Sequence, residues 1–74
     1  PDEIAEYLLA EEDLLVNIIV DAGLLKSKSE ARRMIKQSAV RIDSEIIKDI
    51  QHSLIPGKER ILKVGKRRFL KLIS

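Results

Sequence analysis

The 74-residue chain contains no cysteine and only two aromatic residues, and these shortages exclude several classes of protein. Without cysteine there is no disulfide scaffold, no thiolate metal site and no cysteine nucleophile, so we expect a cytoplasmic protein. The apolar runs fall far short of the ~20 residues that a membrane-spanning helix needs. No apolar segment follows a basic start, as it would in a signal peptide.

Patterns typical of catalysis are also missing. The three glycines, Gly23, Gly57 and Gly65, stand apart, so no glycine-rich loop can cradle a phosphate. The one histidine, His52, has no second histidine or cysteine with which to hold a metal ion. No serine lies in a nucleophile-elbow motif, and a chain this short has little room for a cleft. The sequence therefore predicts no catalytic residue, no metal site and no cofactor in this domain.

Charge is abundant in this chain, and it is segregated along the sequence. Residues 1–25 carry seven acidic residues and no basic one, whereas residues 26–74 carry 14 basic residues and five acidic ones. The net charge of +2 therefore joins a segment of −7 to a segment of +9. Solubility does not require such segregation, so it favours an anionic partner for residues 26–74.

The most informative stretch is residues 26–42. Ser27 and Glu30 have the spacing of a capping box, in which the serine oxygen accepts from the Glu30 backbone N–H, so a helix should start at Lys28. At about 100° per residue, four cations of this helix fall on one side and its apolar residues fall on the other. The four cations are Lys28, Arg32, Arg33 and Lys36. A solvated helix face is the ordinary explanation, but the segregated charge favours a bound anion.

The first part of the chain precedes this helix. Residues 1–12 form an acidic lead-in that fits either a short helix capped by Asp2 or an extended linker. A core-facing helix should begin near Asp13 and end at Gly23, and Leu24 should complete a Schellman motif. These two helices would form a compact pair.

Extended structure is predicted after the basic helix. Val40 and Ile42 alternate with the charged Arg41 and Asp43, so residues 40–42 should form a strand. A turn at Asp43 and Ser44 should follow, and then a second short extended piece at Ile46 and Ile47. A polar loop should then lead to residues 59–73.

Residues 59–73 predict a β-hairpin, because aliphatic residues flank Gly65-Lys66 and Gly-X is favoured in two-residue turns. A two-residue turn would set Lys63 opposite Arg68 and Arg60 opposite Lys71, and directly opposed like charges destabilise a sheet. We therefore interpret the tip as a phosphate-binding finger. The alternative is that its charges guard a sheet edge against pairing. The tip consists of Lys66, Arg67 and Arg68.

These motifs together resemble a known family. Residues 24–37 (Leu-Leu-Lys-Ser-Lys-Ser-Glu-Ala-Arg-Arg-Met-Ile-Lys-Gln), followed by Val40–Ile42, resemble the S-four RNA-binding domain, first described in a small-subunit ribosomal protein. The hairpin at residues 64–69 (Val-Gly-Lys-Arg-Arg-Phe) is most similar to the C-terminal domain of bacterial tyrosyl-tRNA synthetases. The resemblance implies an α+β fold, a two-helix pair on a small, mostly antiparallel twisted sheet, with the domain at residues 13–74.

The resemblance also implies a function and a set of contacts. The domain would anchor tyrosine tRNA, a structured RNA, for a ligase whose separate catalytic domain handles ATP and Mg²⁺. Because the chain has too few aromatic residues to stack a series of bases, recognition should rest on phosphates and shape. Carried over by position, the RNA contacts are Lys26, Ser27, Lys28, Arg32, Arg33 and Lys36, supported by Arg41, Lys66, Arg67 and Arg68.

Two rival functions remain open. The same domain occurs in ribosomal-RNA pseudouridine synthases and in free-standing ribosome-associated proteins. A module that binds a protein or an anionic membrane is the other rival, but a membrane would need the apolar helix face that the core requires, so we expect no membrane partner. The chain also departs from the family's glycine-containing turns, with Ser38-Ala39 after the basic helix and Asp43-Ser44 after the strand. A left-handed non-glycine residue is costly, so we expect a reshaped turn at Ser38.

Overall fold

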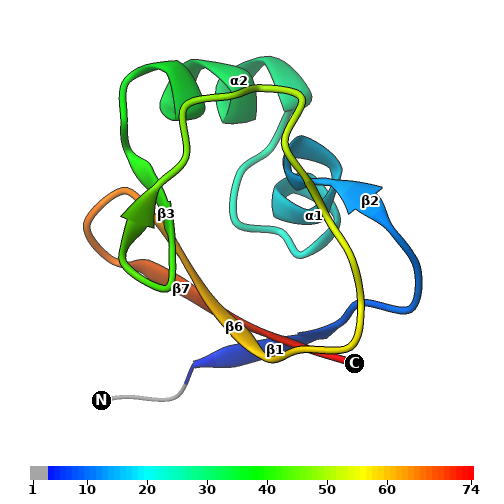
Figure 1. Cartoon of the computed structure of the whole chain (residues 1–74). Coiled ribbons are helices and arrows are strands. Elements are labelled where there is room, and N and C mark those ends of the chain that lie inside the picture. Colours follow the sequence, from blue (N-terminus) through cyan, green and yellow to red (C-terminus); the bar gives the residue numbers. More distant parts are fainter. Residues whose placement is uncertain (1–3) are drawn as a thin grey trace.

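In the computed structural model, which describes residues 4–74, two helices cover one face of a five-stranded sheet (Figure 1). The strand order is β1-β7-β6-β3-β4, and only the pairing of β1 with β7 is parallel. These strands are β1 (Ala5–Leu8), β3 (Val40–Ile42), β4 (Glu45–Ile46), β6 (Arg60–Val64) and β7 (Arg68–Ile73). A separate two-stranded sheet pairs β2 (Asp13–Leu14) with β5 (Ser53–Leu54). The α+β fold predicted from the sequence is confirmed.

The hydrophobic core lies between the helices and one face of the five-stranded sheet, which we call the inner face. Alternate strand residues point into it, as the two-residue period of a strand requires. The buried strand residues include Val40, Leu62, Val64, Leu70 and Leu72. From the other side, α1 (Leu15–Asp21) and α2 (Lys28–Lys36) bury Leu15, Val16, Ile18, Ile19, Ala31 and Ile35. Every buried residue within residues 4–74 is apolar, so the core contains no polar site.

The end of α1 has the predicted Schellman geometry. Gly23 has a φ of +81°, its N–H donates to the Val20 carbonyl at 3.0 Å, and the Leu24 N–H donates to the Ile19 carbonyl at 3.0 Å. The helix starts at Leu15 instead of Asp13, because Asp13 belongs to β2 and pairs with β5. The short strand β5 falls within the segment expected to be a loop.

The turn after α2 is not reshaped. Ser38 takes the left-handed conformation itself, with a φ of +61°, and the Ala39 N–H donates to the Met34 carbonyl at 3.0 Å. The serine thus occupies the place of the family's glycine, at a cost of about 1 kcal/mol. Asp43 and Ser44 likewise have φ values of +52° and +75°, as both central residues of a type I′ turn do. This turn joins β3 to β4, so the predicted strand-turn-strand unit is confirmed.

The start of the described chain is a strand and not the short helix that the sequence permitted. β1 pairs in parallel with β7, from Ala5 opposite Leu70 to Leu8 opposite Ile73. The extended alternative is therefore the one that forms, and it joins the sheet because the edge of β7 supplies backbone partners. The proposed helix cap, Asp2, lies outside the described residues.

The β6–β7 hairpin forms, but the register predicted from the sequence is wrong by one residue. Its loop has three residues, 65–67, so Val64 lies opposite Arg68 and Leu62 opposite Leu70. A two-residue turn would have put Leu62 on the face opposite to Leu70, and burial of both side chains excludes that arrangement. Lys63 consequently lies opposite Phe69, and the predicted like-charge pairs in this hairpin do not exist.

Candidate nucleic-acid interface

The start of α2 is fixed by side-chain hydrogen bonds. Ser27 is the N-cap, and its Oγ accepts from the Glu30 N–H at 3.2 Å, as predicted. The Glu30 carboxylate accepts from the Lys26 N–H at 3.3 Å, one residue before the cap. These bonds satisfy donors that the first turn of a helix leaves unpaired. They also fix the helix start at Lys28, and with it the direction in which each cation points.

The cations of α2 lie on its solvent side. Lys28, Arg33 and Lys36 are exposed, whereas Ala31 and Ile35 on the other side are fully buried. Arg32 is half-buried, and its guanidinium donates to Ser29 Oγ at 3.4 Å. Within residues 4–74 the only ion pair joins Lys71 to Glu59, so no described carboxylate neutralises the cations of α2. The helix therefore presents uncompensated positive charge.

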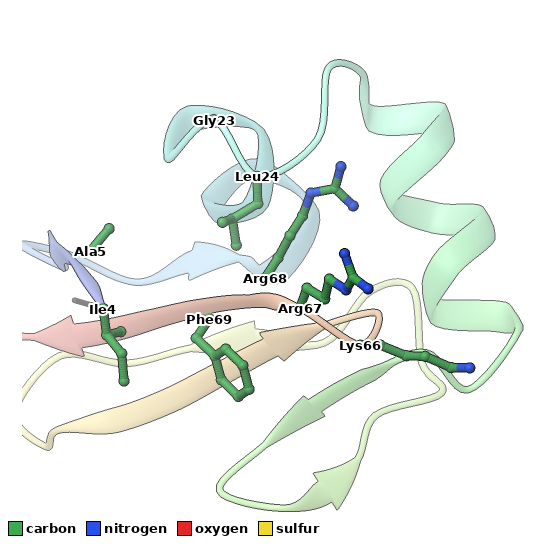
Figure 2. Close-up of a pocket in the computed structure, with 8 residues that line it drawn as sticks. All are labelled: Ile4, Ala5, Gly23, Leu24, Lys66, Arg67, Arg68 and Phe69. Carbon is green, nitrogen blue, oxygen red and sulfur yellow. The ribbon is translucent and has the colours of Figure 1, made fainter. Parts of the chain in front are cut away.

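The hairpin tip is attached to the C-terminal end of this helix. The Gly65 N–H donates to the Ala39 carbonyl at 2.7 Å, directly after α2. Gly65 has a φ of +70°, and a Cβ placed on it would lie 3.5 Å from Met34 Cε. Figure 2 shows Arg67 and Arg68 pointing toward the side of the sheet that carries the helices. The backbone of the cationic tip is thus fixed beside the C-terminal end of the basic helix.

A groove of about 760 Å³ runs beside the tip (Figure 2). Its lining combines cationic and apolar side chains from three segments of the chain. The lining residues are Ile4, Ala5, Gly23, Leu24, Lys66, Arg67, Arg68 and Phe69. Arg68 also borders a smaller hollow that reaches Lys26, the first of the predicted contacts. The two hollows share Gly23, Leu24 and Arg68 in their lining, so they adjoin each other between the tip and the start of α2.

Arg41 is placed differently from the other predicted contacts. It is exposed on β3 between two buried residues, so it lies on the outer face of the sheet, away from the helices. Lys63 of β6 lies directly opposite Arg41, and its Nζ is 5.4 Å from the centre of the Phe69 ring. Lys63 was not among the predicted contacts, because the predicted two-residue turn paired it with Arg68 instead of Phe69. Lys63 stands between the apolar Leu62 and Val64, and this alternation alone indicates that its side chain points away from the core.

Two acidic residues, Glu11 and Glu12, lie in the loop before β2. Figure 1 shows the loop before β2 at the opposite end from the β6–β7 tip. Near this acidic end, burial raises the pKa of the Tyr7 hydroxyl above its usual value of 10.0, and the charges of Asp21 and Asp13 raise the pKa further. Within residues 4–74, this acidic loop and the cationic tip therefore lie at opposite ends of the domain.

Two other kinds of site are absent from residues 4–74. No group of three or more His, Cys, Asp or Glu residues within residues 4–74 could hold a metal ion. In the same part of the chain, no helix is long and apolar enough to cross a membrane. The cationic surface is therefore the principal candidate site of the described residues.

A two-helix pair on a small sheet, with a basic second helix and a basic hairpin tip, defines a domain of the S-four RNA-binding type. The family model described as "Tyrosine--tRNA ligase SYY-like C-terminal domain" matches residues 2–72, and the chain belongs to this family. The resemblance to the C-terminal domain of tyrosyl-tRNA synthetases noted in the sequence is thus confirmed.

Individual relatives agree with the family match. The chain is 49% identical over 80 residues to the tyrosine-tRNA ligase of Carboxydothermus hydrogenoformans, covering 99% of this chain and 20% of the relative. It is 42% identical to the ligase of Thermotoga maritima, covering 97% of this chain and 18% of the relative. It is also 42% identical to the ligase of Francisella tularensis, covering 99% of this chain and 18% of the relative. The chain therefore spans about a fifth of the length of these relatives.

Proposed function

We propose that this domain binds tyrosine tRNA through the cationic surface formed by α2 and the hairpin tip, and that it anchors the tRNA for a tyrosine-tRNA ligase. The observation that carries the proposal is the junction of these two elements at the Gly65–Ala39 hydrogen bond. It sets one cationic group against the end of another, and no carboxylate within residues 4–74 pairs with either. Such a surface neutralises the closely spaced phosphates of a folded RNA.

The packing of α2 supports RNA over an anionic membrane as the partner. A helix that lies on a membrane inserts its apolar face into the lipid. In α2 the apolar residues Ala31 and Ile35 have no exposed surface, because they pack in the core. Of the apolar residues of α2 only Met34 is partly exposed, so the helix offers mainly its cations and polar residues to a ligand.

The remainder of the proposal concerns the whole protein. The relatives are tyrosine-tRNA ligases in which the matched part is about a fifth of the length. We infer that the parent protein is such a ligase, that it acts in the cytoplasm, and that a catalytic domain outside this chain uses tyrosine, ATP and Mg²⁺. The role of the present domain is to increase the affinity for tRNA and to orient it.

The proposal is tested by titrating the 74-residue chain with tyrosine tRNA at several salt concentrations. The logarithm of the affinity should fall linearly with the logarithm of the salt concentration, by about 0.7 to 0.9 for each phosphate neutralised. Arg33→Ala and Lys36→Ala should each weaken binding and reduce this slope by about one contact. The matched control is Lys58→Ala, which removes an exposed cation outside α2 and the tip and should leave both values unchanged.

Thermal unfolding of the same variants separates binding from folding. Exposed substitutions change stability by no more than about 0.5 kcal/mol, so all three variants should melt close to the parent chain. An affinity that does not depend on salt, or an equal loss of binding in the control variant, would overturn the assignment of the interface.

A further inference from the structure

The outer face of the sheet carries most of the exposed apolar surface of the domain. Within residues 4–74, seven large apolar residues are exposed. Five of them lie on or next to this face, where β1, β4, β6 and β7 present alternate residues to solvent. These five are Ile4, Leu8, Ile46, Ile61 and Phe69. Apolar residues gathered on one open sheet face indicate a binding surface.

The charges on this face are sorted into a paired end and an unpaired end. Lys71 lies opposite Glu6 and forms an ion pair with Glu59 at 3.8 Å. Arg41 and Lys63 lie opposite each other at the other end, and no carboxylate within residues 4–74 pairs with either. The outer face is therefore cationic at the end where β3, β6 and β7 run side by side.

Phe69 stands in the same cross-strand row as these two cations. Lys63 lies opposite Arg41 on one side and opposite Phe69 on the other. The ring of Phe69 keeps 40% of its surface exposed and has the Lys63 ammonium 5.4 Å from its centre. A cation beside an exposed aromatic ring is the combination with which proteins hold a nucleobase and its phosphate.

The ring of Phe69 also borders free space. The pairing of β1 with β7 begins at Leu70, so no strand within residues 4–74 covers the edge of β7 beside Phe69. The groove of about 760 Å³ occupies this edge. Figure 2 shows Phe69 and Ile4 pointing to one face of the sheet and Arg68 to the other. A ligand at the edge can therefore reach the aromatic ring from one side and the tip cations from the other.

We propose that Phe69, Lys63 and the adjoining groove bind one unpaired nucleotide of the RNA. The base stacks on Phe69 against Ile4, and Lys63 and Arg41 contact the phosphates next to it. The RNA strand then crosses the free edge of β7 toward Arg68. The inference rests on the proposed function, to which it adds a preference for RNA with an unpaired base. One exposed aromatic residue suffices for a single base, although it cannot form a platform for several.

A second copy of this chain is a poorer occupant of the same face. A symmetric contact would place identical faces against each other. If it sets the cationic ends against each other, it buries Arg41 and Lys63 with no described carboxylate beside them, and burying unpaired charges is costly. An RNA strand supplies phosphates to these cations and a flat base to the ring, so it matches both parts of the surface.

The experiment uses two RNA probes that differ by one nucleotide. One is a short perfect RNA duplex, and the other is the same duplex with a single bulged 2-aminopurine. The chain should bind the bulged duplex about tenfold more tightly, because one base-aromatic stack is gained, and the 2-aminopurine fluorescence should be quenched. Phe69→Leu should abolish both effects while its affinity for the perfect duplex remains. Phe69→Tyr should restore both, because tyrosine keeps the ring.

Leu8→Ala is the matched control, because it removes an exposed apolar side chain of the same face where β1 pairs with Ile73, at the other end of β7 from Phe69. This variant should retain the preference for the bulged duplex. Equal affinity of the parent chain for the two duplexes overturns the nucleotide site, while a steep salt dependence for both duplexes leaves the proposed function standing. Failure to bind either duplex or tyrosine tRNA removes both. Self-association that Phe69→Leu abolishes would assign the face to a second copy and overturn the inference.

Discussion

Arg41 of β3 and Lys63 of β6 lie directly opposite each other on the outer face of the sheet. Like charges in this position destabilise a sheet by a few tenths of a kcal/mol or more. No carboxylate within residues 4–74 forms an ion pair with either side chain. The pair therefore opposes folding, and an anionic ligand beside Phe69, as we propose, would offset its repulsion. The like-charge pairs predicted within the β6–β7 hairpin do not form, and the like-charge pair that exists joins β3 to β6.

The first prediction is that Arg41→Gln increases stability and weakens RNA binding. Removing the repulsion should raise the free energy of unfolding by a few tenths of a kcal/mol. The salt dependence of tyrosine tRNA binding should fall by about 0.7 to 0.9, the effect of one phosphate contact. Chemical denaturation and salt titration measure the two quantities.

Lys71→Gln is the control for this prediction. It also removes a cation from the outer face, but this cation is paired with Glu59. The variant should gain no stability and should keep the salt dependence of the parent chain. If Arg41→Gln behaves in the same way, Arg41 is not part of the RNA interface.

Features that depend on neighbouring residues could be predicted from the sequence. The Ser27 cap, the start of α2 at Lys28 and the end of α1 at Gly23 were all recognised, because each is a local hydrogen-bonding pattern. The exposure of Lys28, Arg33 and Lys36 followed from the helical period. Contact of these residues with RNA stays a prediction, since exposure alone does not test it.

Features that depend on distant partners could not be predicted. The strand β1 forms because it pairs with β7, at the other end of the chain. The residues around Tyr7 contain no local pattern that predicts this pairing. The hairpin register was wrong because the local preference of Gly65-Lys66 for a two-residue turn is weaker than the burial of Leu62 and Leu70 on one face. Lys63 and Phe69 could be recognised as neighbours only after this register was known.

The second prediction concerns the left-handed turn after α2. Ser38→Gly should raise the free energy of unfolding by about 1 kcal/mol, because glycine adopts the φ of +61° without the cost that serine bears. In a domain of this size the melting temperature should rise by about 4 to 8 °C. Thermal unfolding followed by circular dichroism measures the change.

Ser29→Gly is the control, because the same replacement of serine by glycine should here lower the free energy of unfolding. Ser29 lies inside α2, where glycine is a poorer helix former than serine, so this variant should be less stable by about 0.5 kcal/mol. Destabilisation by Ser38→Gly would mean that the Ser38 side chain contributes more than its backbone strain costs.

The third prediction tests the docking of β1 through Tyr7. Burial raises the pKa of its hydroxyl above 10.0, and the charges of Asp21 and Asp13 add to the increase. The folded chain therefore holds this proton more tightly than the unfolded chain. The stability due to Tyr7 should be complete below pH 10 and should be lost as the pH rises through the higher pKa of the folded state.

Tyr7 is the only tyrosine, so its ionisation can be followed by ultraviolet absorbance without interference. The midpoint should lie above 10.0 in the folded chain and return to it in denaturant. Asp21→Asn should lower the folded midpoint, because it removes a nearby negative charge. A normal midpoint in the folded chain would show that β1 does not hold Tyr7 against α1.

The last prediction separates two roles for the hairpin tip. If Lys66, Arg67 and Arg68 contact phosphates, replacing all three with serine should lower the salt dependence of tyrosine tRNA binding by up to about 2.7, which is three contacts of 0.9 each. The register shows Arg68 opposite Val64 and not opposite a cation, so the triple variant relieves no repulsion across the hairpin. Its free energy of unfolding should therefore stay within about 0.5 kcal/mol of the parent value.

The alternative role is protection of the free edge of β7 next to the groove. Charged residues at an exposed strand edge prevent it from pairing with another molecule. In that case the triple variant would keep the affinity and the salt dependence of the parent chain but would self-associate in sedimentation experiments. Lys48→Ser combined with Lys58→Ser removes two exposed cations away from the tip and shows how much a lower net charge alone changes binding. A smaller salt dependence in the monomeric triple variant, absent from this control, assigns the tip to the RNA interface because only lost phosphate contacts reduce counterion release.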